Sequence, residues 1–140
     1  MTRDGILAME TGPELNALIA VELMGWQRQE ETPPGYVCHE GGRDWISPDG
    51  KDWWCNHCGQ EDGFPDFSGS ISAAWDVVEK LMEQNMWWAS EYYRHDDPPY
   101  DWAFCKPRGD NGAFRYYDAK ADALPLAICR AALLAVMETP

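Results

Sequence analysis

The chain has 140 residues, of which 45% are hydrophobic and 25% charged, a balance typical of a globular domain with a buried core and unlike that of a disordered chain. Its formal net charge of −13 argues against binding of duplex nucleic acid, because phosphate contacts depend on clustered lysine and arginine. No apolar run approaches the roughly 18–20 residues of a membrane span, and the first residues lack the apolar stretch of a signal peptide. We therefore expect a cytoplasmic protein that contacts no membrane.

The first helical signal covers residues 11–25. Thr11 and Glu14 form a capping-box pattern, and Pro13 falls in the first turn, where its missing N–H costs nothing. Gly25 is expected to end the helix. One helical face then carries the apolar residues Leu15, Leu18, Ile19 and Leu23.

Residues 26–67 are divided by glycine and proline into short segments. Three of these have strand-like composition: 36–38, 45–47 and 53–55. The segment Ser47–Asp52 carries proline and glycine at turn positions, so we expect a hairpin there.

A second helix is predicted from Ser70, whose hydroxyl suits an N-cap. Its core face should carry the residues that recur at helical spacing: Ile71, Ala74, Trp75, Val78, Leu81 and Met82. Three strands are expected to follow, at 86–93, 100–105 and 113–117. A last helix should run from about Asp122 to Met137, with Leu126, Cys129, Leu133 and Met137 facing inward.

This order of elements is that of an α+β protein, and the short turns require antiparallel strand pairing. Helices on both faces of such a sheet would bury much of the aromatic content, which includes eight tryptophans. We treat residues 1–140 as a single domain, with residues 28–62 as a small β insertion that contains cysteines.

Three segments carry a family resemblance: residues 11–25, the string Ile-Ser-Ala-Ala-Trp-Asp-Val-Val-Glu-Lys at 71–80, and Pro-Leu-Ala-Ile-Cys-Arg-Ala-Ala-Leu-Leu-Ala at 125–135. With their surroundings, over residues 5–25 and 64–137, they resemble the phage ABA sandwich domain family. The resemblance implies an α/β/α sandwich of three layers and a phage or prophage origin. It implies no particular activity, and residues 28–62 look longer than the family's usual connection.

The segment Trp54-Cys-Asn-His-Cys-Gly59 has the spacing of a zinc knuckle, which places two thiolates on one tight turn. A second complete knuckle is missing, because Gly41 stands where the other cysteine would be. Structural zinc would therefore use Cys38, Cys55 and Cys58 with His57 or His39 as the fourth ligand. The alternative is that these thiols bind no metal. Cys105 and Cys129 are expected to be ordinary buried thiols.

Aromatic and arginine side chains alternate in two places, around Trp88 and around Arg115. On a strand, Trp88, Ser90 and Tyr92 share one face, and Trp87 and Tyr93 the other. Rings can stack on a nucleobase while arginine binds phosphate. The alternative is that the rings fill a two-sided sheet and the arginines pair with carboxylates. The candidate ligand-binding residues are Arg43, Trp45, Trp88, Tyr92, Arg94, Arg115 and Tyr117.

The chain has neither a nucleophile elbow nor a glycine-rich phosphate loop, and we expect no enzyme. Together with the phage resemblance, the aromatic and arginine residues favour a counter-defence protein that sequesters a nucleotide-derived immune signal of the host without cleaving it. The alternative is an acidic adaptor, or mimic of nucleic acid, that binds and inhibits a host protein. Surplus tryptophan also favours a homo-oligomer.

Overall fold

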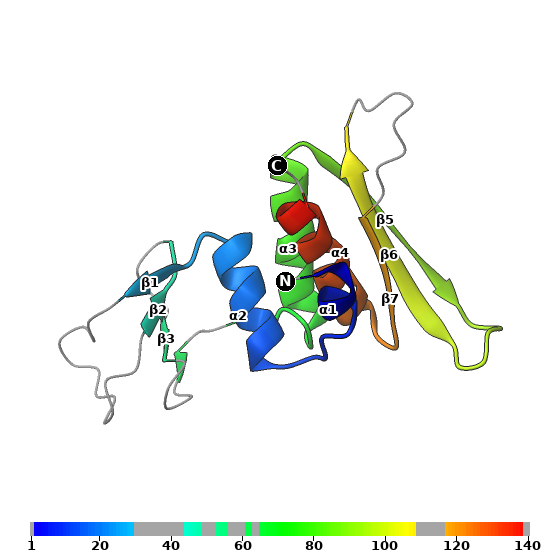
Figure 1. Cartoon of the computed structure of the whole chain (residues 1–140), viewed down its shortest axis with the longest axis horizontal. Coiled ribbons are helices and arrows are strands. Elements are labelled where there is room, and N and C mark those ends of the chain that lie inside the picture. The colour runs from blue at the N-terminus through cyan, green and yellow to red at the C-terminus, as the bar shows by residue number, and fades with distance from the viewer. Residues whose placement is uncertain are drawn as a thin grey trace.

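Four helices and two antiparallel sheets form the part of the chain that we describe in the computed structural model, residues 2–29, 44–48, 53–55, 61–62, 65–108 and 117–138 (Figure 1). The α+β class and the antiparallel pairing agree with the sequence prediction. A short helix, α1 (Arg3–Leu7), opens the chain, with Thr2 as its N-cap. It was not predicted, because five residues are too few to establish a helical period.

Helix α2 (Pro13–Glu22) begins one residue later than a cap at Thr11 would place it. Gly12 occupies the N-cap position, and the hydroxyl of Thr11 instead donates to the carbonyl of Ser68 at 3.3 Å. The predicted capping box is therefore wrong, although Pro13 does lie in the first turn. Gly25, with φ +80°, follows the helix in the left-handed conformation that glycine favours, as predicted.

A buried polar network joins α2 to the segment before α3. The Asn16 amide donates to Asp66 at 2.9 Å, and its carbonyl oxygen accepts from the Ser68 N–H at 2.8 Å. The Ser68 hydroxyl accepts from the Gly12 N–H at 3.1 Å. Because both Asn16 and Ser68 are buried, these bonds fix the start of α2 against a segment 50 or more residues away in the chain.

The small sheet contains β1 (Gln27–Gln29), β2 (Asp44–Ile46), β3 (Trp53–Cys55) and β4 (Glu61–Asp62), in that order. The antiparallel pairing of β2 with β3 confirms the predicted hairpin, and Trp45 stands opposite Trp54. Strands β1 and β4 were not predicted. The strand expected at 36–38 lies outside the described residues.

Helix α3 (Ile71–Glu83) starts at Ser70, whose hydroxyl accepts from the Ala73 N–H, as predicted. Its buried residues are Ala74, Val77, Val78 and Leu81. Three residues of the predicted core face are instead 45–51% exposed: Ile71, Trp75 and Met82. Their assignment to the core was wrong, and the helix carries an apolar stripe that the described fold leaves half open.

The main sheet has the order β5 (Met86–Tyr93), β6 (Tyr100–Pro107) and β7 (Tyr117–Ala121), with both pairings antiparallel. The first strand has the predicted bounds, and the second extends two residues beyond them. The third strand begins, in the described part of the chain, at the residue where the prediction ended. Residues 113–116 lie outside the described part.

Helix α4 (Leu124–Glu138) lies at the centre of the molecule and packs against β6, β7, α3, α2 and α1 (Figure 1). Residues 126–135 are all buried, which explains a sequence that is apolar almost all round. Leu126, Cys129 and Leu133 face inward as predicted, whereas Met137 is partly exposed.

Helices α3 and α4 lie on one face of the main sheet, and α2 lies beyond them on the far side of α4 (Figure 1). Within the described ranges, no helix packs on the other face of the sheet. We call this surface the open sheet face. None of the described helices has the length and apolar character needed to cross a membrane.

Candidate functional site

The two faces of the main sheet follow from strand register, because alternate residues point to opposite faces and cross-strand partners share a face. Ala103 and Cys105 of β6 and Ala119 of β7 are buried beneath the helices. The alternate positions form the open sheet face: Trp87, Ala89, Glu91, Tyr93, Tyr100, Trp102, Phe104, Lys106, Asp118 and Lys120.

Five aromatic rings lie along this face, in one group of three and one pair. Trp87 meets Phe104 edge to face, with ring centroids 5.6 Å apart. Phe104 in turn lies 4.6 Å from Trp102, and Tyr93 stacks on Tyr100 at 4.8 Å. Trp87 is 46% exposed, whereas its four partners are half-buried because the rings shield one another. Together these five rings form the aromatic surface on β5 and β6.

A lysine lies over a ring in each of two parts of this surface. The Nζ of Lys106 is 5.3 Å from the centroid of Trp87, and the Nζ of Lys120 is 4.9 Å from that of Tyr100. These are cation–π distances, at which an ammonium group is attracted by the electron-rich ring face. The open sheet face therefore combines planar rings with two ammonium groups, alongside the carboxylates of Glu91 and Asp118.

A hollow of about 580 Å³ lies where the open sheet face meets the β5–β6 turn. Its lining residues come from this turn and from the adjoining strands: Asp96, Asp97, Pro98, Tyr100, Lys120 and Ala121. Small-molecule sites have volumes of about 300–1,000 Å³. The hollow offers a ring, an ammonium group and two carboxylates to a molecule of nucleotide size.

Tyr93 is held by its neighbour on the same strand. Its hydroxyl donates to the Glu91 carboxylate at 2.8 Å, and this bond, followed by desolvation and by the negative charge of Glu91, raises the pKa of Tyr93. The phenol therefore stays neutral at physiological pH. Its ring is the one that stacks on Tyr100.

The structure separates the predicted ligand-binding residues instead of bringing them together. Trp88 and Tyr92 do share a face, as predicted, but it is the face toward the helices. Trp88 is half-buried against Trp75 of α3, with centroids 5.3 Å apart, whereas Tyr92 is 59% exposed. Arg94 lies beyond the end of β5, where its Nε donates to the Nε2 of His95 at 3.2 Å.

The other predicted ligand-binding residues lie elsewhere. Tyr117 is only 6% exposed beneath the helices, so it offers no ring to a ligand in this conformation. Trp45 belongs to β2 in the small sheet. Arg43 and Arg115 lie outside the described residues.

Three residues of the aromatic surface were missed in the sequence: Tyr100, Trp102 and Phe104. The signal was present, because every second residue of this strand is aromatic, which places all three rings on one face. Strand patterns alone do not show which face of the sheet the helices cover, and this face decides which rings are accessible.

The predicted zinc site stays a prediction. Cys55 ends β3, whereas Cys38, His57 and Cys58 lie outside the described residues. Within the described ranges, no three histidine, cysteine or acidic side chains are grouped as metal ligands. Cys105 and Cys129 are free buried thiols, as predicted, and burial raises the pKa of each to about 12.

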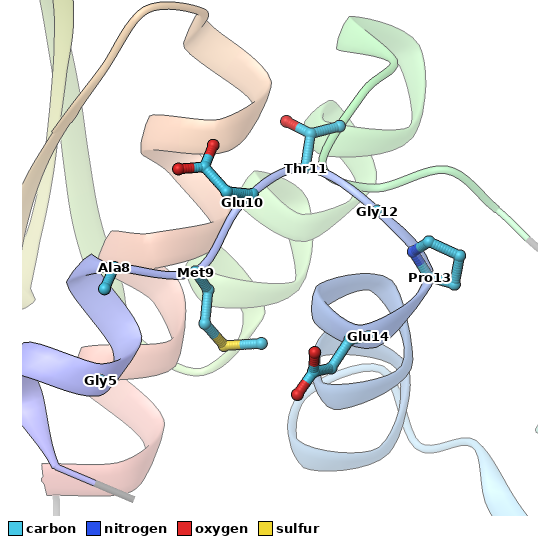
Figure 2. A pocket seen from close by; sticks show the side chains of 8 residues that line it. All are labelled: Gly5, Ala8, Met9, Glu10, Thr11, Gly12, Pro13 and Glu14. Carbon is cyan, nitrogen blue, oxygen red and sulfur yellow. The ribbon is translucent and has the colours of Figure 1, made fainter.

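A second hollow, of about 450 Å³, lies at the α1–α2 connection (Figure 2). The side chains of Met9 and Glu14 point toward each other across the space between the two helices. The Met9 carbonyl accepts from Nε and Nη2 of Arg130, and the Lys120 carbonyl accepts from Nη1. Since these bonds hold the wall of the hollow to α4 and β7, we assign this region a structural role.

Comparison with known proteins supports the resemblance noted in the sequence. The family model of the phage ABA sandwich domain matches residues 17–133, from within α2 to within α4. No curated protein and no solved structure matches the chain. Because the matched stretch covers most of the chain, this protein belongs to the phage ABA sandwich domain family.

Proposed function

We propose that this chain is a phage counter-defence protein that sequesters a nucleotide-derived immune signal of the host, in the cytoplasm of the infected bacterium, without cleaving it. The observation that carries the proposal is the aromatic surface on the open sheet face, with lysines over Trp87 and Tyr100. Family membership supports the phage setting.

The hollow beside Tyr100 is the proposed position of the ligand. One face of the Tyr100 ring stacks on Tyr93, and the Lys120 ammonium lies over the ring at 4.9 Å. A nucleobase would take the place of this ammonium on the ring, and Lys120 would turn to pair with the phosphate. Stacking of a base on an aromatic side chain contributes about 1–3 kcal/mol. Asp96 and Asp97 are placed to accept hydrogen bonds from ribose hydroxyls.

Nucleotide binding at this position requires that the rings of the open sheet face remain accessible to the ligand. The three-layer sandwich implied by the family name stays a prediction, and a helical layer on the open sheet face would cover the same rings. The homo-oligomer predicted from surplus tryptophan would bring two such faces together with ligand between them. Sedimentation of the protein with and without nucleotide distinguishes these arrangements.

Calorimetric titration with cyclic dinucleotides and with ADP-ribose tests the function. We expect one of them to bind, and Lys120→Ala and Tyr100→Ala to weaken binding by at least about tenfold, since each removes a main contact. Glu14→Ala, on exposed α2 surface, serves as the control. Recovery of unchanged nucleotide after heat denaturation supports sequestration. Absence of binding, or equal binding by all variants, rejects the proposed site.

A second candidate function is an acidic adaptor that binds and inhibits a host protein. It is favoured by the net charge of −13 together with the exposed apolar residues of α3. Pulldown from host lysate distinguishes it from the first: a stoichiometric basic partner supports the adaptor, and its absence supports the nucleotide proposal.

A further inference from the structure

Strand β5 forms one edge of the main sheet and pairs, among the described strands, with β6 alone. It is eight residues long, contains no proline, and carries Glu91 as its one charged side chain. Natural proteins usually protect such edges with lysine, proline, bulges or short strands, because unpaired N–H and C=O groups recruit further strands. Strand β5 contains neither lysine nor proline, and its eight residues make it a long edge strand.

Helix α3 packs on this edge strand. It contacts β5 and α4, whereas α4 packs on β6 and β7. Side chains that α3 leaves exposed on its β5 side therefore lie beside the position that a further strand would occupy.

The exposed side of α3 next to β5 is apolar. Ile71, Trp75 and Met82, with the buried Val78 between them, follow spacings of four, three and four residues and thus form one stripe. Trp75 contacts Trp88 of β5 edge to face at 5.3 Å, which places the stripe against the helix-side surface of that edge. An added strand would pack its apolar side chains beneath this stripe while its main chain pairs with β5.

The charge around the edge is negative. Asp76 and Glu79 are exposed on the solvent side of α3, next to the apolar stripe, and Glu91 is exposed on β5. Of the nearby basic residues, Lys80 pairs with Glu83 at 3.6 Å, Lys106 lies over Trp87 on the open sheet face, and Arg94 lies beyond the end of β5. The helix side of the edge therefore carries an excess of carboxylates. An approaching segment with basic side chains is therefore favoured electrostatically over an acidic one.

A second copy of this chain is a poor occupant of the edge. Pairing of two β5 strands about a two-fold axis would bring together the exposed carboxylates of both copies, at Asp76, Glu79 and Glu91, which repel each other. A basic strand from another protein meets no such repulsion.

We infer that the β5 edge and the α3 stripe together bind an extended segment of another protein, with alternating apolar and basic side chains, as an added strand of the main sheet. This interaction surface is distinct from the open sheet face, so the inference does not depend on nucleotide binding. It would provide the adaptor candidate with its contact surface.

The test uses a fluorescently labelled peptide of eight residues in which valine and lysine alternate. A peptide of four lysines followed by four valines has the same composition without the alternation. By fluorescence anisotropy we expect the alternating peptide to bind the full chain at least about tenfold more tightly, because only it presents one apolar face as a strand. Equal binding of both peptides, or of neither, overturns the inference.

Variants localise the contact. Met82→Lys and Trp75→Lys place a cation in the stripe, and each should weaken binding of the alternating peptide by about tenfold or more. The double variant Asp76→Lys with Glu79→Lys should weaken binding of this peptide similarly. The control is the double variant Glu14→Lys with Glu22→Lys on α2, which changes the net charge by the same amount and should change binding by less than about twofold. Circular dichroism verifies that each variant folds.

Peptide binding at the β5 edge can be distinguished from nucleotide binding beside Tyr100. Lys120→Ala, on β7 at the other edge of the sheet, should leave peptide binding unchanged. Equal weakening by the α2 pair would show bulk charge attraction and reject the edge as the site. A dimer of the chain that Trp75→Lys abolishes would show that a second copy occupies the edge, which also rejects the inference.

Discussion

The indole Nε1 of Trp102 donates to Oδ2 of Asp118 at 3.0 Å and thereby joins β6 to β7 across the open sheet face. The Oδ1 of the same carboxylate lies 3.5 Å from Nη2 of Arg3 in α1. One side chain therefore fixes an aromatic ring and also ties the N-terminal helix to the edge strand. The indole bond is part-buried, whereas the side chains of Arg3 and Asp118 are 45% and 40% exposed.

Replacing Asp118 should therefore cost more than replacing Arg3. We expect Asp118→Ala to lower the free energy of unfolding by about 1–2 kcal/mol, because the indole N–H loses a charged acceptor. Arg3→Ala should cost less than about 1 kcal/mol, since solvent screens the exposed pair. Urea denaturation measures both. Equal losses would show that the ion pair, and not the indole bond, is the main contribution of Asp118.

Arg130 should be more important for stability than any other basic residue in the described structure. Arg130→Met leaves the Met9 and Lys120 carbonyls without the guanidinium that donates to them, and we expect a loss of about 2–4 kcal/mol. Arg130→Lys retains the charge but not the planar fork, so its loss should be intermediate. A Met variant as stable as the wild type would mean that desolvation of the guanidinium cancels its three bonds.

The two adjacent tryptophans of β5 should differ in their effect on stability. Trp88 is half-buried between the sheet and Trp75, and Trp88→Ala should cost about 2–4 kcal/mol. Trp87 is more exposed on the open sheet face, and Trp87→Ala should cost about 1 kcal/mol through its contacts with Phe104 and Lys106. Thermal denaturation followed by circular dichroism compares them. A larger loss for Trp87 would contradict the assignment of the two faces.

Thiol reactivity at pH 8 should divide the five cysteines into two groups. Cys105 and Cys129 should react with a thiol reagent only on unfolding, because burial excludes the reagent and raises the pKa of both thiols to about 12. If zinc is bound, Cys38, Cys55 and Cys58 should react faster after a chelator is added. Mass spectrometry of labelled peptides reads each site. If the chelator does not change the labelling rate of Cys38, Cys55 and Cys58, these thiols bind no metal.

The same two buried thiols should make stability fall in alkali. As pH rises past about 9, the unfolded chain loses their protons, whereas the folded chain keeps them until about pH 12. The folded state then binds more protons, so the free energy of unfolding decreases with pH across this window and is unaffected below it. The double variant Cys105→Ala with Cys129→Ala should show a shallower decrease. An unchanged slope would mean that other groups cause it.

The sequence predicted the long elements better than their surroundings. Strand β5 and helix α3 were found because their apolar periods extend over eight residues or more. The period of α3 did not reveal that Trp75 and Met82 are exposed, since helical spacing is the same whether or not a neighbour covers the stripe. The cap of α2 was assigned wrongly because Thr11 bonds to Ser68, a contact 57 residues away.

The candidate site was less predictable than the fold. Alternation placed Trp88 and Tyr92 together, but only the position of α3 decides that Trp88 is half-buried against Trp75, whereas Trp87 on the opposite face is exposed. Tyr117 reads as an exposed aromatic next to arginine and is buried because α4 packs on β7. The residue pattern of one strand does not show which face of that strand the helices cover.

The central position of α4 also affects synthesis of the protein. Every other helix and two strands of the main sheet rest on it, yet it comes last among the described elements. A nascent chain that has reached only residue 121 has its strands but lacks the surface that buries their apolar side. On the ribosome, the apolar side of β6 and β7 therefore stays uncovered until this last helix has emerged from the exit tunnel.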